Sequence, residues 1–330
     1  MSPLFGHDAA IAAFRAGLDS GRLHHAWLLA GPKGVGKASF ADKAALRVLA
    51  SGAGAPVDAP GLDVPDEHPA ARLIAAGSHP DHVRLERLVK DSGTELARSI
   101  NVDQVRGLQR LFATTPSMSP WRTVVIDAID DLETGGANAL LKNLEEPPPS
   151  TVFLLVSHAP ERLLPTIRSR CRLLRFSTLD DDAMTSALRG ALSDAEEEEE
   201  IAALARVGEG APGRAIAWRG LEVEALDREM DALVREGDRT NARRAALAQS
   251  LALKSAQPRY EAFLARAPSR IAAEARRRRG PALAEALALW ERAVGLAGSA
   301  QRLSLDAQST VFELAGMLAA LAPAAEKDAA

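Results

Sequence analysis

Cysteine is almost absent from this chain, since Cys171 is the only one among 330 residues. A single thiol excludes an internal disulfide framework and any zinc site built from several cysteines, and it fits a reducing compartment. Aromatic residues make up only 4% of the sequence, with one tyrosine, which disfavours a platform of rings for stacking single-stranded nucleic acid. No stretch approaches the roughly 20 apolar residues of a membrane-spanning helix, and the first residues lack a basic segment followed by an apolar run. We therefore expect a soluble cytoplasmic protein with no membrane partner.

The chain also lacks a strong excess of charge of either sign. Its formal net charge is -4, with 47% hydrophobic and 25% charged residues. This is the composition of a globular protein with ample material for a core. The negative net charge argues against DNA binding over the whole surface of the protein, but it does not exclude a local basic patch that binds DNA. Because 330 residues are too many for one ordinary core, two or three domains are expected.

Short apolar runs alternate with helical patterns in the first half of the chain. Five runs are bounded by Gly, Pro or charged residues as buried strands are, at 25–30, 82–86, 123–127, 151–157 and 171–176. The helix candidates between them lie at 8–20, 37–50, 101–113 and 134–146. This alternation predicts a parallel sheet covered by helices on both faces, with ligands at the carboxyl ends of the strands.

After about residue 178 the strands disappear, and Ala, Leu, Arg and Glu recur at helical spacing. Breaks between helices are expected at 208–213 and around Pro258, Pro268 and Gly280. Earlier in the chain, residues 51–70 show no periodicity and predict a surface loop or a partly disordered insertion. The simplest division gives three domains, namely an α/β domain at 1–177, a small helical domain at 178–220 and a helical domain at 221–330.

A glycine-rich segment with the spacing of a phosphate-binding loop follows the first predicted strand and precedes a predicted helix. Backbone N–H groups and the positive end of that helix can cradle phosphate oxygens there, while the lysine reaches the terminal phosphates. We take as candidate nucleotide-binding residues Gly31, Pro32, Lys33, Gly34, Val35, Gly36, Lys37, Ala38 and Ser39. The alternative is a glycine-rich turn that binds nothing.

The position after the lysine of this loop carries the wrong residue for hydrolysis. A Ser or Thr hydroxyl is required there to hold the metal ion, and the chain has Ala38. Ser39 cannot replace it, because one helical step turns a side chain by about 100°. The loop therefore predicts phosphate-loop ancestry without predicting activity.

A second part of a hydrolytic site is expected at the end of the strand at 123–127. Asp127 is the Walker-B-like carboxylate that could hold magnesium through water. The next position, where hydrolysing ring-forming ATPases normally have a glutamate, is Ala128. Asp130 is as easily a turn or capping residue as a replacement base. Ala38 and Ala128 together predict that hydrolysis by this chain is lost.

Several segments together resemble the clamp-loader subunits of bacterial DNA polymerase III. The similarity is dense over about 1–176 and weaker through VGEGAPGRAIAW, and its most specific parts are NALLKNLEEPPPSTVFLL and PTIRSRC. The resemblance implies an α/β P-loop fold of the AAA+ class with a parallel sheet, followed by a small helical lid domain and a C-terminal all-α collar domain that serves oligomerisation. The helical remainder is compatible with this assignment but carries no specific motif.

The resemblance also implies a site that acts in trans. In this family the Ser-Arg-Cys triplet of one subunit places its arginine at the ATP bound by the neighbouring subunit, and here the triplet is Ser169, Arg170 and Cys171. A guanidinium there can stabilise the charge that develops on a transferred phosphoryl group. The alternative is a basic surface cluster of Arg168, Arg170, Arg172 and Arg175 without a catalytic role.

Two weaker sensor positions follow from the same resemblance. Ser157, with His158 beside it, stands where relatives sense the terminal phosphate, although polar groups that satisfy a strand end are an equal alternative. Arg214 matches the second sensor, and its alternative role is an interdomain contact. Relatives usually carry a four-cysteine zinc module after the first helix, whereas the corresponding stretch here offers only scattered histidines, His68, His79 and His82. We predict no zinc and no other metal.

Two runs of like charge are interpreted as ordinary helix ends. The acidic run at 196–200 is expected at a helix start, where it suits the helix dipole. The four arginines at 276–279 are expected at a solvated helix end before Gly280, with an acidic partner or DNA phosphate as the minority alternative. The Ala/Leu stripes from 282 to 322 are expected in a core or a subunit interface.

The resemblance and the two alanines lead to one functional expectation. The chain is expected to be a clamp-loader member with no independent ATPase, which belongs to the DNA-directed DNA polymerase (nucleotidyltransferase) holoenzyme and needs no cofactor, with ATP or ADP possible in a degenerate site. Its expected partners are gamma or tau and delta subunits in a hetero-pentameric ring, together with the sliding clamp and, through the complex, primed DNA. The alternatives are an ATP-hydrolysing motor of the gamma/tau type and, less favoured, another P-loop ATPase such as a helicase.

Overall fold

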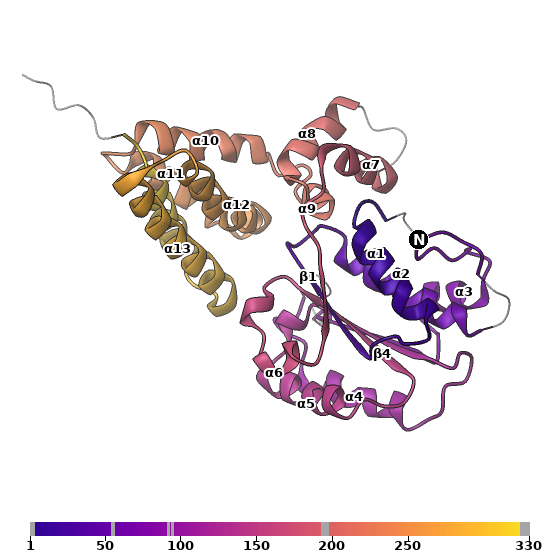
Figure 1. The fold of residues 1–330 in the computed structure, drawn as a ribbon. Coiled ribbons are helices and arrows are strands. Elements are labelled where there is room, and N and C mark those ends of the chain that lie inside the picture. Colours follow the sequence, from indigo (N-terminus) through magenta and orange to yellow (C-terminus); the bar gives the residue numbers. More distant parts are fainter. Residues whose placement is uncertain (1–3, 54–56, 91–92, 94–95, 193–197, 324–330) are drawn as a thin grey trace, which may run out of the picture. The chain divides into compact units, whose positions relative to one another are not determined.

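The computed structural model describes residues 4–53, 57–90, 93, 96–192 and 198–323. The chain divides into two compact units, Met1–Ile216 and Ala217–Ala330. The first contains a sheet with helices on both faces and three further helices after it (Figure 1). The second consists of helices in the part that the structure describes. The division at 177 and 178 stays a prediction, since the three helices after the sheet belong to the first compact unit.

The sheet of the first unit has five strands in the order β2-β3-β4-β1-β5, and every neighbouring pair is parallel. The strands are β1 (Ala26–Ala30), β2 (His82–Glu86), β3 (Arg122–Asp127), β4 (Thr151–Ser157) and β5 (Arg172–Arg175). All five predicted strands are confirmed within one residue at each end. The parallel pairing places the ends of β1, β3 and β4 side by side, which confirms the predicted α/β domain with a parallel sheet.

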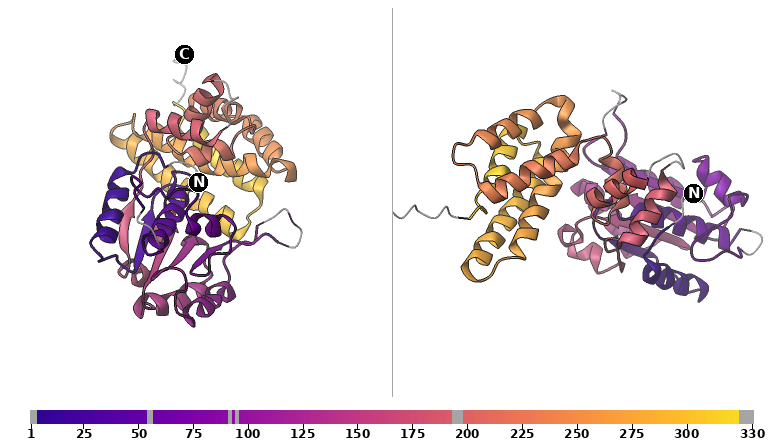
Figure 2. Two further views of the ribbon diagram at one scale, coloured as in Figure 1. Left: turned by 90° about the vertical axis from the view of Figure 1, so that its right-hand side faces the viewer. Right: turned by 90° about the horizontal axis from the view of Figure 1, so that it is seen from above.

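Helices cover both faces of this sheet (Figures 1 and 2). Those within and directly around the sheet are α1 (Asp8–Asp19), α2 (Lys37–Ser51), α3 (Pro69–Ala75), α4 (Val102–Phe112), α5 (Thr134–Glu145) and α6 (Pro165–Arg168). The three that follow are α7 (Asp181–Ala191), α8 (Glu198–Gly208) and α9 (Pro212–Ala217). The four helices predicted in this half are confirmed, whereas α3 was not predicted.

Alternation along the strands builds two cores. Trp27 and Leu29 of β1 pack with Phe14 of α1 and Phe40 of α2 on one face. Leu28, between them, packs on the other face with residues of α4 and α5. Both faces are therefore apolar, as expected of a parallel strand that is buried on both sides.

The loop between α2 and α3 is held more firmly than its composition suggests. Arg47 of α2 donates hydrogen bonds to the carbonyls of Val57 and Asp63, at 3.0 and 2.8 Å. Leu62 is buried, with 2% of its surface exposed. The expectation of a surface loop at 51–70 is therefore wrong at Leu62, while residues 54–56 lie outside the described part of the chain.

The second unit is a bundle of helices (Figure 2). Its members are α10 (Val223–Glu236), α11 (Ala242–Leu251), α12 (Gln257–Ala275), α13 (Gly280–Leu303) and α14 (Ala307–Ala319). The break expected around Pro258 is confirmed, since α12 begins at Gln257, whereas the break expected around Pro268 is wrong, because α12 continues through it. Pro258 lies in the first turn, where its missing N–H costs nothing, and Pro268 is buried inside the helix, where packing outweighs the lost hydrogen bond.

Both charge runs lie at helix ends, as predicted. The first turn of α8 carries Glu198, Glu199 and Glu200, while residues 196 and 197 are not described. The four arginines at 276–279 follow directly after the last residue of α12, Ala275. Among the described residues, none of the helices has both the length and the apolar content to span a membrane.

Candidate functional site

The glycine-rich loop joins β1 to α2 at the carboxyl edge of the sheet. Gly34 and Gly36 have φ angles of 87° and 107°, which side-chain-bearing residues rarely adopt. Gly31 lies so close to the residue that follows β5 that an added Cβ would be 2.1 Å from the carbonyl oxygen of Phe176. These three glycines are therefore required by the backbone path, and the path ends at the N-terminus of α2, where a phosphate-binding loop must end.

Lys37 is the first residue of α2 and is almost completely buried, with 2% exposed. Its ammonium group donates hydrogen bonds to the carbonyls of Gly31 and Pro32, at 2.6 and 2.5 Å. Burial lowers its pKa to about 8, while the nearby carboxylates of Asp130 and Asp127 act to raise it. The lysine thus lies in the loop beside two carboxylates, as a phosphate-binding lysine would.

Two segments of the same unit pack against the loop. The imidazole Nε2–H of His7, just before α1, donates to the carbonyl of Val35 at 2.8 Å. From α9, the N–H of Gly213 donates to the carbonyl of Gly34 at 2.9 Å. An added Cβ on Gly34 would lie 2.6 Å from the backbone nitrogen of Arg214. The loop is therefore in direct contact with α9. His7 and α9 both limit the space beside it.

The positions that serve the metal ion and the attacking water in active P-loop ATPases carry alanine here. Ala38 is half-buried and offers only a methyl group, and the side chain of Ser39 is exposed. Ala128, after β3, is 3% exposed and packs in the core with the residues of α1 and α2. A carboxylate at 128 would have to replace a methyl group in packed apolar surroundings.

Asp127, the Walker-B-like residue, forms an ion pair that the sequence did not reveal. The guanidinium of Arg84, on the neighbouring strand β2, contacts the carboxylate of Asp127 at 2.6 Å, that of Asp42 of α2 at 2.5 Å and that of Glu86 at 2.9 Å. One cation thus lies among three carboxylates. Asp127 is therefore engaged in an ion pair with which a magnesium ion would have to compete, although the cluster as a whole keeps an excess of two negative charges.

The pKa shifts reflect this enclosure. Burial raises the pKa of Asp42, and the charge of Arg84 opposes that rise. For Arg84 itself, burial acts to lower the pKa, but the charges of Asp42, Asp127 and Glu86 outweigh burial and raise it. Arg84 therefore remains charged at every pH at which the protein folds.

The carboxylate of Asp130 is held by three hydrogen bonds. Asp130 lies in a 3-10 turn, Ile129–Asp131, directly after β3. Its carboxylate accepts hydrogen bonds from the hydroxyl of Ser157 at 3.0 Å and from the backbone N–H groups of His158 and Ala159 at 2.6 and 3.1 Å. This carboxylate thus ties the turn after β3 to the end of β4, and the structure brings Ser157 and Asp130 together beside Lys37.

His158 stays neutral at physiological pH. Burial lowers its pKa to about 4, and the nearby charge of Lys37 acts in the same direction. The Nδ1 atom of His158 is buried without a hydrogen-bond partner. A neutral imidazole beside the lysine of the loop is thus part of the candidate site.

Arg170 lies two residues after the end of the short helix α6. Its guanidinium contacts the carboxylate of Glu145, the last residue of α5, at 2.9 Å and donates to the carbonyl of Thr166 at 2.9 Å. Ser169 is exposed, whereas burial raises the pKa of the Cys171 thiol to about 12, so that the thiol stays protonated. Arg170 has no ion pair with the loop residues among the described contacts, which fits a side chain directed at something other than its own P-loop.

The other predicted positions have structural partners. Arg214 lies on α9 and faces Glu209 at 3.6 Å. The histidines that were considered for zinc serve their own backbone or a neighbouring strand: His68 caps α3, His79 accepts from the N–H of Asp81, and His82 bonds to the hydroxyl of Thr123. In the residues that the structure describes, no cluster of three potential metal ligands is present. The absence of zinc stays a prediction.

His82 gives a pH dependence of stability. Burial lowers its pKa from 6.5 to about 4, so between these two pH values the unfolded chain binds more protons than the folded one. Stability should therefore fall as the pH falls, and His82 should contribute a loss of about 2 kcal/mol at pH 5 relative to pH 7. Urea denaturation at both pH values should show that His82→Gln reduces the pH-dependent loss by about this amount. A variant with the same pH dependence as the original chain would contradict the assignment to His82.

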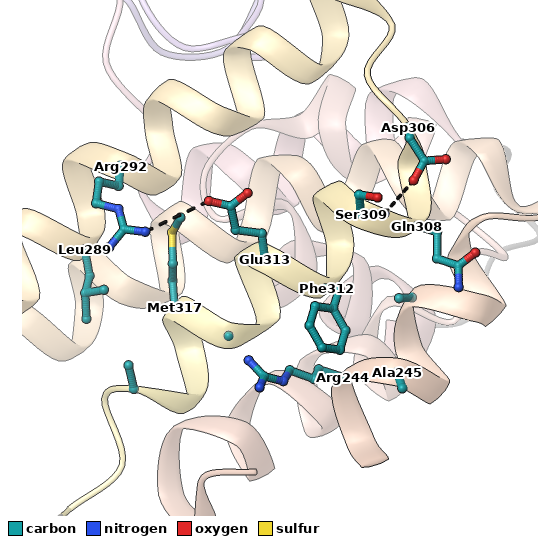
Figure 3. A pocket seen from close by; sticks show the side chains of 13 residues that line it. Arg244, Ala245, Leu289, Arg292, Asp306, Gln308, Ser309, Phe312, Glu313 and Met317 are labelled. Atoms are coloured by element: carbon teal, nitrogen blue, oxygen red, sulfur yellow. Dashed lines mark hydrogen bonds and ion pairs between the residues drawn. The ribbon is translucent and has the colours of Figure 1, made fainter. Parts of the chain in front are cut away.

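The second unit contains a hollow of about 760 Å³ between α11, α13 and α14 (Figure 3). Its charged groups are balanced, since Arg292 faces Glu313 at 3.9 Å and the Asp306 carboxylate caps the first turn of α14. Arg244 lies over the ring of Phe312, with 4.5 Å between the guanidinium carbon and the ring centre. The hollow therefore offers no excess charge to an ionic ligand.

Comparison with known proteins assigns the first half of the chain to a protein family. A family model described as "DNA polymerase III, delta subunit" matches residues 6–180. The chain is 41% identical over 147 residues to the DNA polymerase III subunit delta' of Pseudomonas aeruginosa, which covers 44% of this chain and 41% of that relative. It is 32% identical over 210 residues to the DNA polymerase III subunit tau of Escherichia coli, which covers 62% of this chain and 30% of that relative. The matches thus span less than half the length of these relatives.

A solved structure is also similar in part. The gamma subunit-related DNA polymerase III protein of Thermotoga maritima aligns over 94% of this chain and 98% of its own, with a TM-score of 0.42 and 15% identity.

Proposed function

Because the chain belongs to the family described as DNA polymerase III, delta subunit, we propose that it is the delta-prime subunit of a bacterial clamp loader. In this proposal the subunit helps to load the sliding clamp onto primed DNA in the cytoplasm. It does not hydrolyse ATP itself, and it supplies Arg170 to the ATP site of a neighbouring motor subunit.

The observation that carries the loss of hydrolysis is the ion pair between Arg84 and Asp127, at 2.6 Å. A magnesium-dependent site needs the charge of Asp127 for the metal, a hydroxyl at position 38 and a base near position 128. Ala38 and Ala128 supply neither group, and Arg84 holds the carboxylate of Asp127 in an ion pair. The glycine backbone and Lys37 still fit phosphate oxygens, so ATP or ADP as a static ligand is compatible with the loop, whereas the hydroxyl ligand that active P-loops give to magnesium is missing.

The role of Arg170 is supported by its position and by its partners. The side chain lies at the end of a short helix and is held by one carboxylate, that of Glu145. It is therefore accessible enough to exchange this partner for the phosphates of another subunit, and an arginine in that position is worth about 10³ to 10⁵ in rate in other phosphoryl-transfer enzymes. The proposed ring contains gamma or tau motor subunits and a delta subunit beside this chain, with the 221–330 helices as its collar.

The alternative function is an ATP-hydrolysing motor subunit of the gamma/tau type. The match to tau extends over a larger share of this chain than the match to delta', which favours keeping this candidate. The residues at 38 and 128 and the Arg84–Asp127 ion pair speak against it, and a turnover assay separates the two.

Steady-state ATP hydrolysis by the purified chain with magnesium is expected to stay at the level of a protein-free control, because no group holds the metal or activates water. Lys37→Ala should leave this background unchanged, while static nucleotide binding, measured by equilibrium dialysis without magnesium, should weaken. Arg206→Ala, which replaces an arginine on α8, is a suitable control for effects of substitution and purification that do not involve the loop. Robust turnover that Lys37→Ala abolishes would establish the motor alternative instead.

A further inference from the structure

A cleft lined by arginines lies between α10 and α12 of the second unit. Its volume is about 330 Å³, and four arginines line it together with two carboxylates: Arg228, Arg235, Arg270, Arg277, Asp231 and Glu274. The two helices are packed against each other. In a chain with a formal net charge of -4, this concentration of positive charge is a local feature that the composition does not predict.

The carboxylates in the cleft are already used by arginines. Asp231 forms an ion pair with Arg270, and Glu274 faces Arg277 at 3.5 Å and Arg278 at 3.4 Å. The two arginines of α10 are different. Arg235 approaches only the adjacent Glu236, at 4.0 Å, and within the described chain Arg228 has no ion pair. With four cations and two anions in its lining, the cleft has an excess of two positive charges.

The arginines are also spaced regularly. Arg228 and Arg235 are seven residues apart on α10, whereas Arg270 lies on α12 and Arg277 lies two residues beyond the last residue of that helix, Ala275. Seven residues are two helical turns, so Arg228 and Arg235 lie on one face of α10 about 10 Å apart. Together with Arg270 and Arg277, which line the same cleft, this pair can contact charges that repeat along a linear ligand.

We propose that this cleft binds the phosphate backbone of DNA, without reading its sequence. The planar fork of arginine matches phosphate oxygens with two hydrogen bonds, and all four cations of the lining are arginines. Aromatic side chains are missing from the described lining, so bases have nothing to stack on. The apolar lining is limited to Val234 and Ala273, which gives the side chains of an acidic peptide little to pack against. These features favour a ligand that is recognised by backbone charge alone.

This site goes beyond the proposed function. Only the choice of DNA as the polyanion rests on the proposed function. The binding experiment needs no hydrolysis, no neighbouring subunit and no Arg170. Its outcome is therefore independent of the ATPase measurements that test the proposed function.

The test measures binding of the full chain to a fluorescent 20-base-pair duplex of random sequence by anisotropy, as a function of salt concentration. Arg228→Gln with Arg235→Gln should weaken binding about tenfold at roughly 50 mM salt and reduce the slope of log K against log salt by about 2, since each arginine contacts one phosphate. Neither substitution removes an ion pair of Asp231 or Glu274, so the bundle should fold normally, which circular dichroism can verify.

A matched control removes two charges from the same unit outside the cleft. Lys254→Gln with Arg292→Gln changes exposed side chains on η3 (Lys254–Ala256) and α13, and binding should stay within twofold of the original chain. Equal weakening by both double variants would overturn the site, since it would reflect net charge alone. An unchanged affinity of the cleft variant would overturn it as well. Polyglutamate that displaces the duplex at equal charge concentration, through the same arginines and with higher affinity, would identify an acidic protein segment as the occupant instead.

Discussion

Replacement of Arg170 by alanine in the assembled clamp loader is expected to slow ATP hydrolysis at the neighbouring subunit about 10³-fold, because a guanidinium on the developing charge of the phosphoryl group is lost. The subunit itself should remain folded and in the ring. Its half-buried guanidinium contacts Glu145 at 2.9 Å and the carbonyl of Thr166. Loss of such a surface pair costs about 0 to 1 kcal/mol.

The measurement requires a clamp loader in which only the ATP site that Arg170 faces can hydrolyse ATP. In the reconstituted complex, the P-loop lysine is replaced in every motor subunit except the one that Arg170 faces, and single-turnover hydrolysis is followed together with clamp loading. Arg168→Ala is the matched control, because it removes an exposed arginine two residues away and should change neither rate. Arg170→Lys should recover only part of the rate, since the charge remains but the fork is lost.

Glu145 offers a further check on the same assignment. Glu145→Gln removes the carboxylate that holds Arg170, so the arginine is freed for its partner and hydrolysis should be unchanged or faster. If Arg170→Ala left hydrolysis and loading at their original rates, the arginine would belong to a basic surface cluster without a catalytic role.

Local sequence patterns were sufficient to predict the sheet. The strands β1, β3 and β4 are short apolar runs that are buried on both faces, and their length suits a strand better than a helix. The edge strands β2 and β5 are more exposed. The phosphate loop was equally predictable, because Gly34 and Gly36 occupy φ angles that few other residues accept. At Pro268 the local pattern was misleading, since burial inside α12 outweighs the loss of one hydrogen bond.

Contacts between strands could not be predicted from the same patterns. Arg84 was visible as a charged residue within the strand at 82–86, but its partner depends on which strand lies beside it and in which register. The structure pairs Arg84 with Val125 and Glu86 with Asp127, which places two carboxylates directly opposite each other. Like charges in that arrangement destabilise a sheet unless a cation lies between them, and Arg84 is that cation. Asp130 was likewise ambiguous until β4 was placed next to β3.

Replacement of Arg84 by methionine is expected to destabilise the first unit by about 3 kcal/mol, because three carboxylates would lose the cation among them. The contacts at risk are those with Asp42, Asp127 and Glu86, at 2.5, 2.6 and 2.9 Å, and 28% of the arginine side chain is exposed. Urea denaturation at pH 7, followed by circular dichroism, measures the loss. Arg87→Met is the matched control, since it breaks a single ion pair with Asp131, at 3.2 Å, and should cost less than about 1 kcal/mol.

The same variant separates charge from packing. Combining Arg84→Met with Asp42→Asn and Asp127→Asn removes two of the three carboxylate charges and should restore most of the lost stability. Millimolar magnesium should raise the midpoint of unfolding of the single variant, whose carboxylates then attract a divalent cation, and should leave the original chain unchanged. A single variant that lost less than about 0.5 kcal/mol, or a triple variant no more stable than it, would show that Arg84 does not balance Asp127. The loss of hydrolysis would then depend on Ala38 and Ala128 alone.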